Sequence, residues 1–299
     1  MTKIFIAGAT GFLGSALARR LAEFEHEVYT IYRNGNRKDS KIFEVPFVCY
    51  ENSSNSELSS RLGELGVEII INCIGCTNVD YCEKNSKHAI YANIEIPKKL
   101  SAVANAIGSR LIHVSSDQVV GSDQPFASES VDCRPVNVYA LTKLFGEFEV
   151  SKQCQRSLIL RTNFFGTALG QEHTFCDWAL RELKQGKPIS GYTDVYFNPL
   201  FINNLIDAII RLFDIEHRGI LNLTASDRIS KYQFLVLLAE YLNCDSSLVR
   251  QIEVREHYKT QRPKEMTLSN HLAESRYGIC FSSIRNQIRD FKESSLNNT

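Results

Sequence analysis

The N-terminal half of the chain alternates between short apolar runs and segments in which apolar residues recur with a helical period. Runs of strand length occupy 3–7, 27–32, 46–50, 68–73, 110–115 and 158–162. Helical patterns lie between them, up to about Phe24, over 56–66 and over 86–107, where Pro97 is expected to bend the helix. Strands and helices that alternate in this way predict an α/β fold with a doubly wound parallel (Rossmann) sheet, covered by helices on both faces.

The alternation of strands and helices fades after Phe165. Helical patterns then recur at 175–184, 202–213 and 232–242, with short strand-like segments between them. We therefore predict a nucleotide-binding Rossmann domain over residues 1–165 and a smaller, mainly substrate-binding C-terminal lobe over residues 166–299. Segments near 195–225 are expected to pack back on the Rossmann domain.

Composition narrows the partners. The 34 basic and 34 acidic side chains cancel, which argues against a nucleic-acid partner. The longest apolar runs have the length of core strands, and no charged-then-apolar leader precedes Lys3, so neither a membrane span nor a secretory signal is expected. The 9 cysteines are scattered and odd in number, which is typical of reduced thiols. Together these features predict a cytoplasmic protein.

A glycine-rich loop follows the first strand and opens the first helix, in the pattern Gly8-x-x-Gly11-x-x-Gly14. Glycines let the backbone turn sharply and approach a pyrophosphate at the helix N-terminus. Glycine is also common in turns that bind nothing, but the position at the start of an α/β chain favours a dinucleotide. The expected cofactor contacts in this loop are Gly8, Thr10, Gly11, Phe12, Leu13 and Gly14.

The segment after the second strand addresses the choice of cofactor. It reads Tyr32-Arg33-Asn34 and has no carboxylate until Asp39. An acidic side chain there would bind the 2′-hydroxyl of NAD, whereas arginine suits the 2′-phosphate of NADP. We therefore predict that Arg33 selects NADPH, with NADH as the alternative cofactor; the competing interpretation is a solvated basic loop.

The stretch Tyr139-Ala-Leu-Thr-Lys143 carries the candidate chemistry. Residues four apart on a helix share a face, so the Lys143 ammonium can lower the pKa of the Tyr139 phenol from about 10 toward neutrality. Such a tyrosine exchanges a proton with a carbonyl oxygen near neutral pH. Ser116 ends the fifth strand, where its hydroxyl can orient the same oxygen; a simple Ser-Asp turn is the alternative.

Two further features have competing interpretations. Cys73-Ile-Gly-Cys76 has the spacing of a redox or zinc motif, but no second pair completes a metal site and Cys82 reads as an isolated thiol. We expect Cys73, Ile74 and Gly75 to pack beside the cofactor, and we expect no metal. Arg262-Pro263 lies in a late loop that could meet a substrate phosphate, and a surface turn is an equal alternative.

These residues resemble the extended short-chain dehydrogenase/reductase family over nearly the full length. The matching segments are 8–14, 72–79, Asn93, the strand end at Ser116, 135–139, 143–147 and 161–166. Within the family, 135–143 and 262–269 are similar to dTDP-4-dehydrorhamnose reductases and CDP-abequose synthases. The resemblance implies a catalytic triad of Ser116, Tyr139 and Lys143, the last two also touching the cofactor together with Asn93. It implies a nucleotide-diphosphate sugar as substrate, bound by Asp117, Asn163 and Arg262.

The departures from the family pattern restrict the reaction. Rhamnose-branch reductases carry Thr-Asp-Tyr-Val-Phe where this chain has Ser116-Asp117-Gln118-Val119-Val120. Sugar dehydratases of the family carry an Asp-Glu pair there, and the neutral amide of Gln118 cannot replace the glutamate as a base.

The resemblance then implies NADPH-dependent reduction of the C4 ketone of a nucleotide-linked 4-keto-6-deoxyhexose. Our first expectation is conversion of CDP-4-dehydro-3,6-dideoxyglucose to CDP-abequose, and the second is a dTDP-4-dehydrorhamnose type of substrate. Either product would feed O-antigen and lipopolysaccharide biosynthesis. The alternatives are an NAD-dependent nucleotide-sugar 4-epimerase and a non-catalytic, cofactor-binding regulatory subunit. A homodimer is a candidate assembly.

Overall fold

The computed structural model describes residues 1–24, 26–30, 42–44, 53–121, 124–168, 174–254 and 260–297, with side chains for all of these except 42–44 and 295–297. The chain forms two compact units. The first, called the sheet unit, comprises Met1–Ser115, Val138–Leu160 and Ile209–Ile220. The second, called the lobe unit, comprises Ser116–Asn137, Arg161–Ala208 and Leu221–Thr299.

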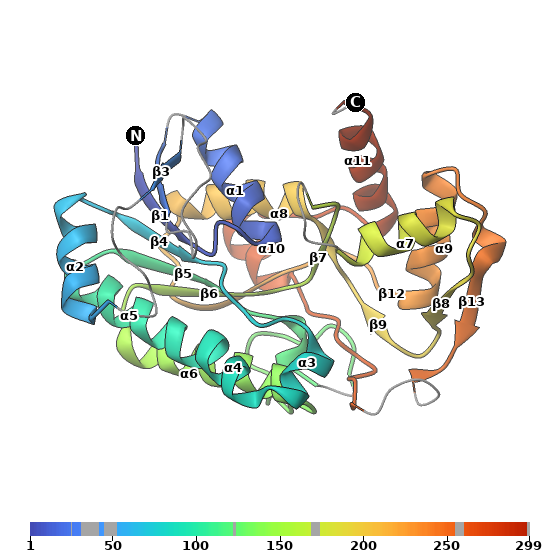
Figure 1. The fold of residues 1–299 in the computed structure, drawn as a ribbon, viewed down its shortest axis with the longest axis horizontal. Coiled ribbons are helices and arrows are strands. Elements are labelled where there is room, and N and C mark those ends of the chain that lie inside the picture. The colour runs from blue at the N-terminus through green and yellow to red at the C-terminus, as the bar shows by residue number, and fades with distance from the viewer. Residues whose placement is uncertain are drawn as a thin grey trace. The chain divides into compact units, whose positions relative to one another are not determined.

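A seven-stranded sheet has the strand order β11-β6-β5-β4-β1-β2-β3 (Figure 1). The pairs from β3 through β6 are all parallel. The strands are β1 (Lys3–Ala7), β2 (Glu27–Thr30), β3 (Ile42–Glu44), β4 (Ile69–Asn72), β5 (Arg110–Val114), β6 (Ser157–Thr162) and β11 (Gly219–Leu223). The first six follow the order of a doubly wound nucleotide-binding fold, so the predicted fold class is confirmed.

Helices cover both faces of this sheet. Helix α1 (Phe12–Glu23) lies on one face, and α5 (Ile96–Ile107) and α6 (Val138–Gln153) lie on the other (Figure 1). Helix α2 (Asn55–Glu64) packs on α5. The inner strands are apolar on both sides because both sides are covered. A buried core joins strand and helix side chains, with these members among others: Phe5, Leu58, Leu62, Ile70, Leu100, Val103, Leu111, Val150 and Ile159.

Most predicted elements that fall on described residues lie within a few residues of the observed ones. The expected strand at 46–50 lies outside the described residues. The helix expected over 86–107 is divided into α4 (Ser86–Ile90), a π-helical turn (Tyr91–Glu95) and α5. Pro97 lies in the first turn of α5, directly after the π-helical turn.

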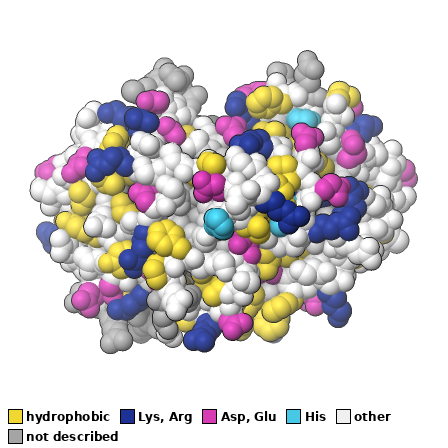
Figure 2. All heavy atoms as spheres, turned by 180° about the vertical axis from the view of Figure 1, so that it is seen from behind, with side chains coloured by type: hydrophobic (Ala, Val, Ile, Leu, Met, Phe, Trp, Pro, Cys, Tyr) yellow, Lys and Arg dark blue, Asp and Glu magenta, His cyan; other side chains and the backbone are white. Residues whose placement is uncertain are grey.

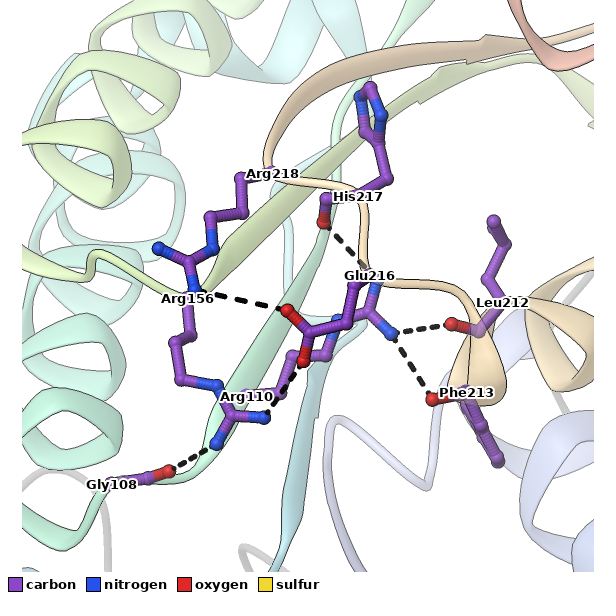
Figure 3. A network of polar contacts seen from close by, with 8 residues as sticks. All are labelled: Gly108, Arg110, Arg156, Leu212, Phe213, Glu216, His217 and Arg218. Carbon is purple, nitrogen blue, oxygen red and sulfur yellow. Dashed lines mark hydrogen bonds and ion pairs between the residues drawn. The ribbon is translucent and has the colours of Figure 1, made fainter. Parts of the chain in front are cut away.

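A buried arginine fixes the segment that follows helix α8 (Ile202–Arg211) within the sheet unit (Figure 3). Arg110 begins β5 and donates hydrogen bonds to the carbonyl oxygens of Leu212, Phe213 and His217. Nearby, the exposed Arg156 donates to the Gly108 carbonyl at 2.8 Å. Carbonyls at a helix end have no partner within the helix, so a guanidinium with several donors satisfies them together.

The described part of the lobe unit contains three two-stranded sheets and several helices. The strand pairs are β7 (Phe164–Phe165) with β10 (Leu200–Phe201), β9 (Tyr196–Phe197) with β12 (Ile229–Ser230), and β8 (Ile189–Tyr192) with β13 (Val249–Ile252). The helices include α7 (Phe175–Lys184), α9 (Lys231–Tyr241), α10 (His271–Tyr277) and α11 (Ile284–Asn297). Aromatic rings form its core: Phe165 and Phe197 meet Phe234 edge to face, with ring centroids 5.0 and 5.2 Å apart.

Charged side chains of both signs lie across the surface. Figure 2 shows basic and acidic side chains interspersed over one face, as the zero net charge suggests. No helix in the described ranges is both long and apolar enough to cross a membrane.

Candidate active site

The glycine loop takes the form that the sequence predicts. It follows β1, and Gly11 caps α1 while its amide donates to the Gly8 carbonyl at 3.0 Å. Gly8 has a φ of +89°, a conformation that other residues rarely adopt. A Cβ on Gly14 would lie 2.2 Å from the Gly8 carbonyl oxygen. No side chain among the described residues makes a cap hydrogen bond to α1, and the amides at a helix N-terminus are the groups that bind a pyrophosphate.

A second wall of the expected cofactor site is the turn after β4. Asn72 closes the strand, and its side-chain oxygen accepts from the Ile74 amide at 3.0 Å. Asn93, on the π-helical turn, holds the other end: its Oδ1 accepts from the Cys76 amide at 2.8 Å and its Nδ2 donates to the Cys76 carbonyl at 3.1 Å. These bonds hold the turn Cys73–Gly75 beside the glycine loop, since a Cβ on Gly8 would meet Cys73 and Ile74 at 3.0 Å.

The π-helical turn is also tied to the catalytic helix. Asn93 Nδ2 donates to the Thr142 hydroxyl at 3.0 Å. Helix α6 approaches closely because position 146 is a glycine, where a Cβ would lie 2.2 Å from the Asn93 carbonyl oxygen. π-Helical turns are frequent at functional sites, and here the turn lets one buried amide bridge the cofactor wall and α6.

Tyr139 and Lys143 lie one turn apart on α6, as their spacing predicts, and both are buried. Tyr139 packs against Val79, Cys82 and Ala89. Lys143 Nζ donates to the Val114 carbonyl at the end of β5, at 2.7 Å. Gly75 lies close to this ammonium, since a Cβ at that position would be 3.9 Å from Nζ. The lysine is thereby placed at the carboxyl edge of the sheet, next to the β4 turn.

The Lys143 ammonium is buried. Burial lowers the pKa of Lys143 to about 8, and the negative charge of Glu147 opposes this shift. Glu147 in turn accepts a hydrogen bond from the Ser115 hydroxyl. His113 lies on β5, and its Nδ1 is 3.0 Å from Nδ2 of Asn72. Burial, aided by the Lys143 charge, holds the pKa of His113 well below its ordinary value, so this imidazole is neutral.

The lobe unit supplies the remaining candidates. Ser116 is buried; its hydroxyl donates to Asp117 Oδ1 at 3.0 Å and accepts from the Gln118 amide at 3.2 Å. Asn163 Nδ2 donates to Asp117 Oδ2 at 2.5 Å. Burial raises the pKa of Asp117, while the Asn163 bond and the Lys231 charge oppose that rise. Ser116, Asp117 and Asn163 therefore form one connected polar group.

Lys231 was not predicted as a site residue. It begins α9, and its Nζ lies 3.3 Å from the centroid of the Phe197 ring. Burial lowers its pKa to about 8, and the charges of Asp117 and Cys176 oppose this. Arg262 is half-buried, in the loop before Glu265, which forms an isolated β-bridge with Tyr196. Gln118 Oε1 is buried and has no hydrogen-bond partner in the described part of the chain.

The structure thus groups the predicted residues in two sets. The glycine loop, the β4 turn, Asn93, Tyr139 and Lys143 belong to the sheet unit, whereas Ser116, Asp117, Asn163 and Arg262 belong to the lobe unit. Arg33 lies outside the described residues. Thr142, Glu147 and His113 were missed; Glu147, four residues after Lys143, had a readable helical spacing, whereas the other two had no signal in the sequence. No described cluster of His, Cys, Asp and Glu could hold a metal ion.

Comparison with known proteins gives concordant results. A probable low-salt glycan biosynthesis reductase of Haloferax volcanii is 28% identical over 249 residues, 82% of each chain. The dTDP-4-dehydrorhamnose reductase of Escherichia coli is 26% identical, covering 79% of this chain and 77% of that protein. The crystal structure of dTDP-4-dehydrorhamnose reductase from Bacillus anthracis with NADP superposes with a TM-score of 0.85 at 23% identity, covering 98% of this chain and 100% of that one.

The family model described as the RmlD substrate binding domain matches residues 1–296, nearly the whole chain. The chain therefore belongs to the RmlD substrate binding domain family.

Proposed function

We propose that the protein is an NADPH-dependent reductase of the C4 ketone of a nucleotide-diphosphate 4-keto-6-deoxyhexose. Its enzyme class, an NAD(P)H-dependent oxidoreductase, agrees with the activity named for the Escherichia coli relative. The observation that carries the proposal is the position of Lys143. It lies one turn after the buried Tyr139, and its Nζ is anchored on the Val114 carbonyl at the carboxyl edge of the sheet.

Each residue of the proposed triad has one task. NADPH supplies the hydride that reduces the ketone carbon. Tyr139 gives a proton to the ketone oxygen as negative charge develops on it. Lys143 stabilises the phenolate that remains, because an ammonium nearby favours the charged form of the phenol. Ser116 orients the ketone oxygen, and Asp117 with Asn163 holds the Ser116 hydroxyl.

The cofactor loop fits a dinucleotide. Gly8, Gly11 and Gly14 carry no side chain beside the α1 N-terminus, and the turn Cys73–Gly75 lies next to Gly8. We propose NADPH because Arg33 follows the second strand without an acidic neighbour, and because NADP is bound in the Bacillus anthracis structure. The residues that would hold it are those of the glycine loop, the β4 turn and Asn93, with Tyr139 and Lys143 on the nicotinamide side.

The sugar nucleotide is the finer part of the proposal. The Escherichia coli relative acts on dTDP-4-dehydrorhamnose, and the Haloferax relative is named for glycan biosynthesis. The first name favours a dTDP-linked substrate, and the second favours a role in glycan biosynthesis. We propose that the product enters surface glycans such as O-antigen. The departure at Ser116–Val120 keeps a CDP-linked 3,6-dideoxy ketosugar as the second candidate.

The test is a substrate panel. Purified protein is mixed with NADPH and with CDP-, dTDP- or GDP-linked 4-keto-6-deoxysugars, and NADPH oxidation is followed with product analysis. We expect stoichiometric oxidation with one member. Copurified NAD with sugar inversion and no net oxidation would identify a 4-epimerase. Binding of NADPH without turnover on any member would identify a regulatory subunit.

Two variants tie the activity to the site. Tyr139→Phe should lower turnover by about 10²- to 10⁴-fold, because it removes the proton donor, while NADPH binding persists. The matched control is Tyr81→Phe, since Tyr81 is an exposed tyrosine whose hydroxyl contacts His88. Equal turnover in Tyr139→Phe and wild type would reject the proposed mechanism.

A further inference from the structure

Three cysteines follow β4, and the structure pairs two that the C-x-x-C spacing does not. The Cys82 sulphur lies 3.4 Å from the Cys76 sulphur and 3.4 Å from the Cys76 carbonyl oxygen. Helix α3 (Val79–Lys84) begins immediately after Asn78, whose side chain caps the Tyr81 amide at 2.9 Å, and its first turn brings Cys82 back onto the Cys76 loop. The interpretation of Cys82 as an isolated thiol is therefore wrong.

The surroundings of the two sulphurs differ. Cys76 is half-buried, whereas Cys82 is fully buried. Burial and the hydrogen bond to Cys76 raise the pKa of Cys82 to about 12, so Cys82 stays a thiol at neutral pH. An accessible sulphur beside a protected one is the arrangement in which the first is oxidised and the second resolves the product.

We propose that Cys76 and Cys82 form an oxidative modification site, at which a peroxide produces a reversible disulphide that slows turnover. The effect on turnover rests on the reductase function proposed above, whereas formation of the disulphide does not.

The chemistry is balanced without any bound group. The Cys76 thiolate attacks one peroxide oxygen, the O–O bond breaks, and hydroxide leaves with the Cys76 sulphur as a sulphenic acid. The Cys82 sulphur then attacks the Cys76 sulphur, the S–O bond breaks, and the hydroxyl departs with the Cys82 proton as water. The hydroxide takes up the proton that Cys76 released on ionising, so two thiols lose two electrons and the peroxide is reduced to two molecules of water.

The bridge would act on the catalytic helix through two connections. A disulphide requires about 2.05 Å between sulphurs, so the present 3.4 Å must close. Cys82 belongs to the same buried cluster as Tyr139. The Cys76 backbone is held on both sides by Asn93, which also donates to Thr142 on α6. Displacements of about 1 Å in a catalytic site can cost about 100-fold in rate, so we expect turnover to fall by about 10- to 100-fold.

In the cytoplasm, which the sequence predicts for this protein, a Cys76–Cys82 disulphide is expected to be transient. Cytosolic thiols are kept reduced, and disulphides that form there are usually regulatory. The scattered cysteines of this chain predict such a compartment. The pair is therefore expected to be reduced at rest and to return to that state with a thiol reductant.

The experiment uses the full chain, reduced and then exposed to hydrogen peroxide. Remaining thiols are alkylated, chymotrypsin cleaves after Tyr81 between the two cysteines, and tandem mass spectrometry identifies any bridge under non-reducing conditions. Turnover is measured before peroxide, after it and after dithiothreitol, with NADPH binding and thermal unfolding as measures of folding.

Cys76→Ser and Cys82→Ser are compared with Cys280→Ser, which replaces an exposed cysteine of the lobe unit. We expect a Cys76–Cys82 bridge and a reversible loss of turnover in wild type and Cys280→Ser, and neither in the other two variants. A bridge that uses Cys73, or two free thiols after peroxide, would overturn the proposal, as would a bridge with unchanged turnover. If no substrate is turned over, mass spectrometry still decides the bridge, so failure of the reductase proposal remains separable.

Discussion

The buried charge of Lys143 makes the stability of the sheet unit depend on pH in a defined direction. The pKa of Lys143 is lowered from 10.5 to about 8 by burial. Below pH 8 the lysine is protonated in both the folded and the unfolded chain, and the fold bears the full cost of the buried charge. Between pH 8 and 10.5 the folded protein releases the proton and the unfolded chain retains it. The free energy of unfolding must therefore rise with pH in this window.

The size of the rise follows from the two pKa values. The full difference between 10.5 and about 8 corresponds to about 3 kcal/mol, at 1.36 kcal/mol for each pH unit. Between about pH 7.5 and about pH 9.5 the relief amounts to about 2 kcal/mol. Lys143→Met lacks this proton, so its own change over the same interval should be smaller than that of wild type by about 2 kcal/mol.

The assay is urea unfolding at both pH values, followed by circular dichroism. Titrating groups that the Lys143 charge does not influence contribute equally to wild type and variant and cancel in the comparison. The control is Lys98→Met, since Lys98 is an exposed lysine near Glu149 and should reproduce the wild-type pH dependence. If Lys143→Met also matched wild type, the assignment of a buried, charged lysine to this site would be refuted.

Three further changes test contacts of the sheet unit. Gly14→Ala should weaken NADPH binding and lower the free energy of unfolding by about 1–3 kcal/mol, because its Cβ would lie 2.2 Å from the Gly8 oxygen. Gly63→Ala is the control and should do neither, since its Cβ would lie 3.6 Å from its nearest neighbour. Fluorescence titration measures NADPH binding, and urea unfolding measures stability. Arg110→Met should cost about 3 kcal/mol by removing a charged donor from three carbonyls, and the exposed Arg156→Met at most about 1 kcal/mol; equal urea midpoints would contradict this. Asn93→Ala should lower both turnover and stability, the latter by about 2–3 kcal/mol, because Cys76 and Thr142 lose buried partners, while the exposed Asn105→Ala leaves both unchanged.

The sequence was sufficient for features set by local pattern. The strands around Ile4, Ile70 and Ile112 are apolar on both faces, so the sheet was predictable. The glycines of the first loop lie between a strand and a helix at the start of an α/β chain, so the loop was predictable too. Contacts between residues distant in sequence were not. Asn93 could be singled out only through the family resemblance, because its bonds to Cys76 and Thr142 depend on how α6 packs. Cys82 was misread because sequence spacing does not show how α3 folds back on its own N-terminal loop.

The π-helical turn Tyr91–Glu95 carries the contacts of Asn93 and leads directly into the proline at the start of α5. A π turn contains one residue more than a regular helix needs. Deleting one residue between Tyr91 and Asn93 would instead place Pro97 in the interior of a regular helix, where its ring meets the carbonyl of Asn93, four residues earlier, at a cost of about 3 kcal/mol. The same deletion would change the direction of the Asn93 side chain and so release both the Cys76 loop and Thr142. The extra residue of the π turn is therefore needed both for the backbone around Pro97 and for the bonds of Asn93 to Cys76 and Thr142.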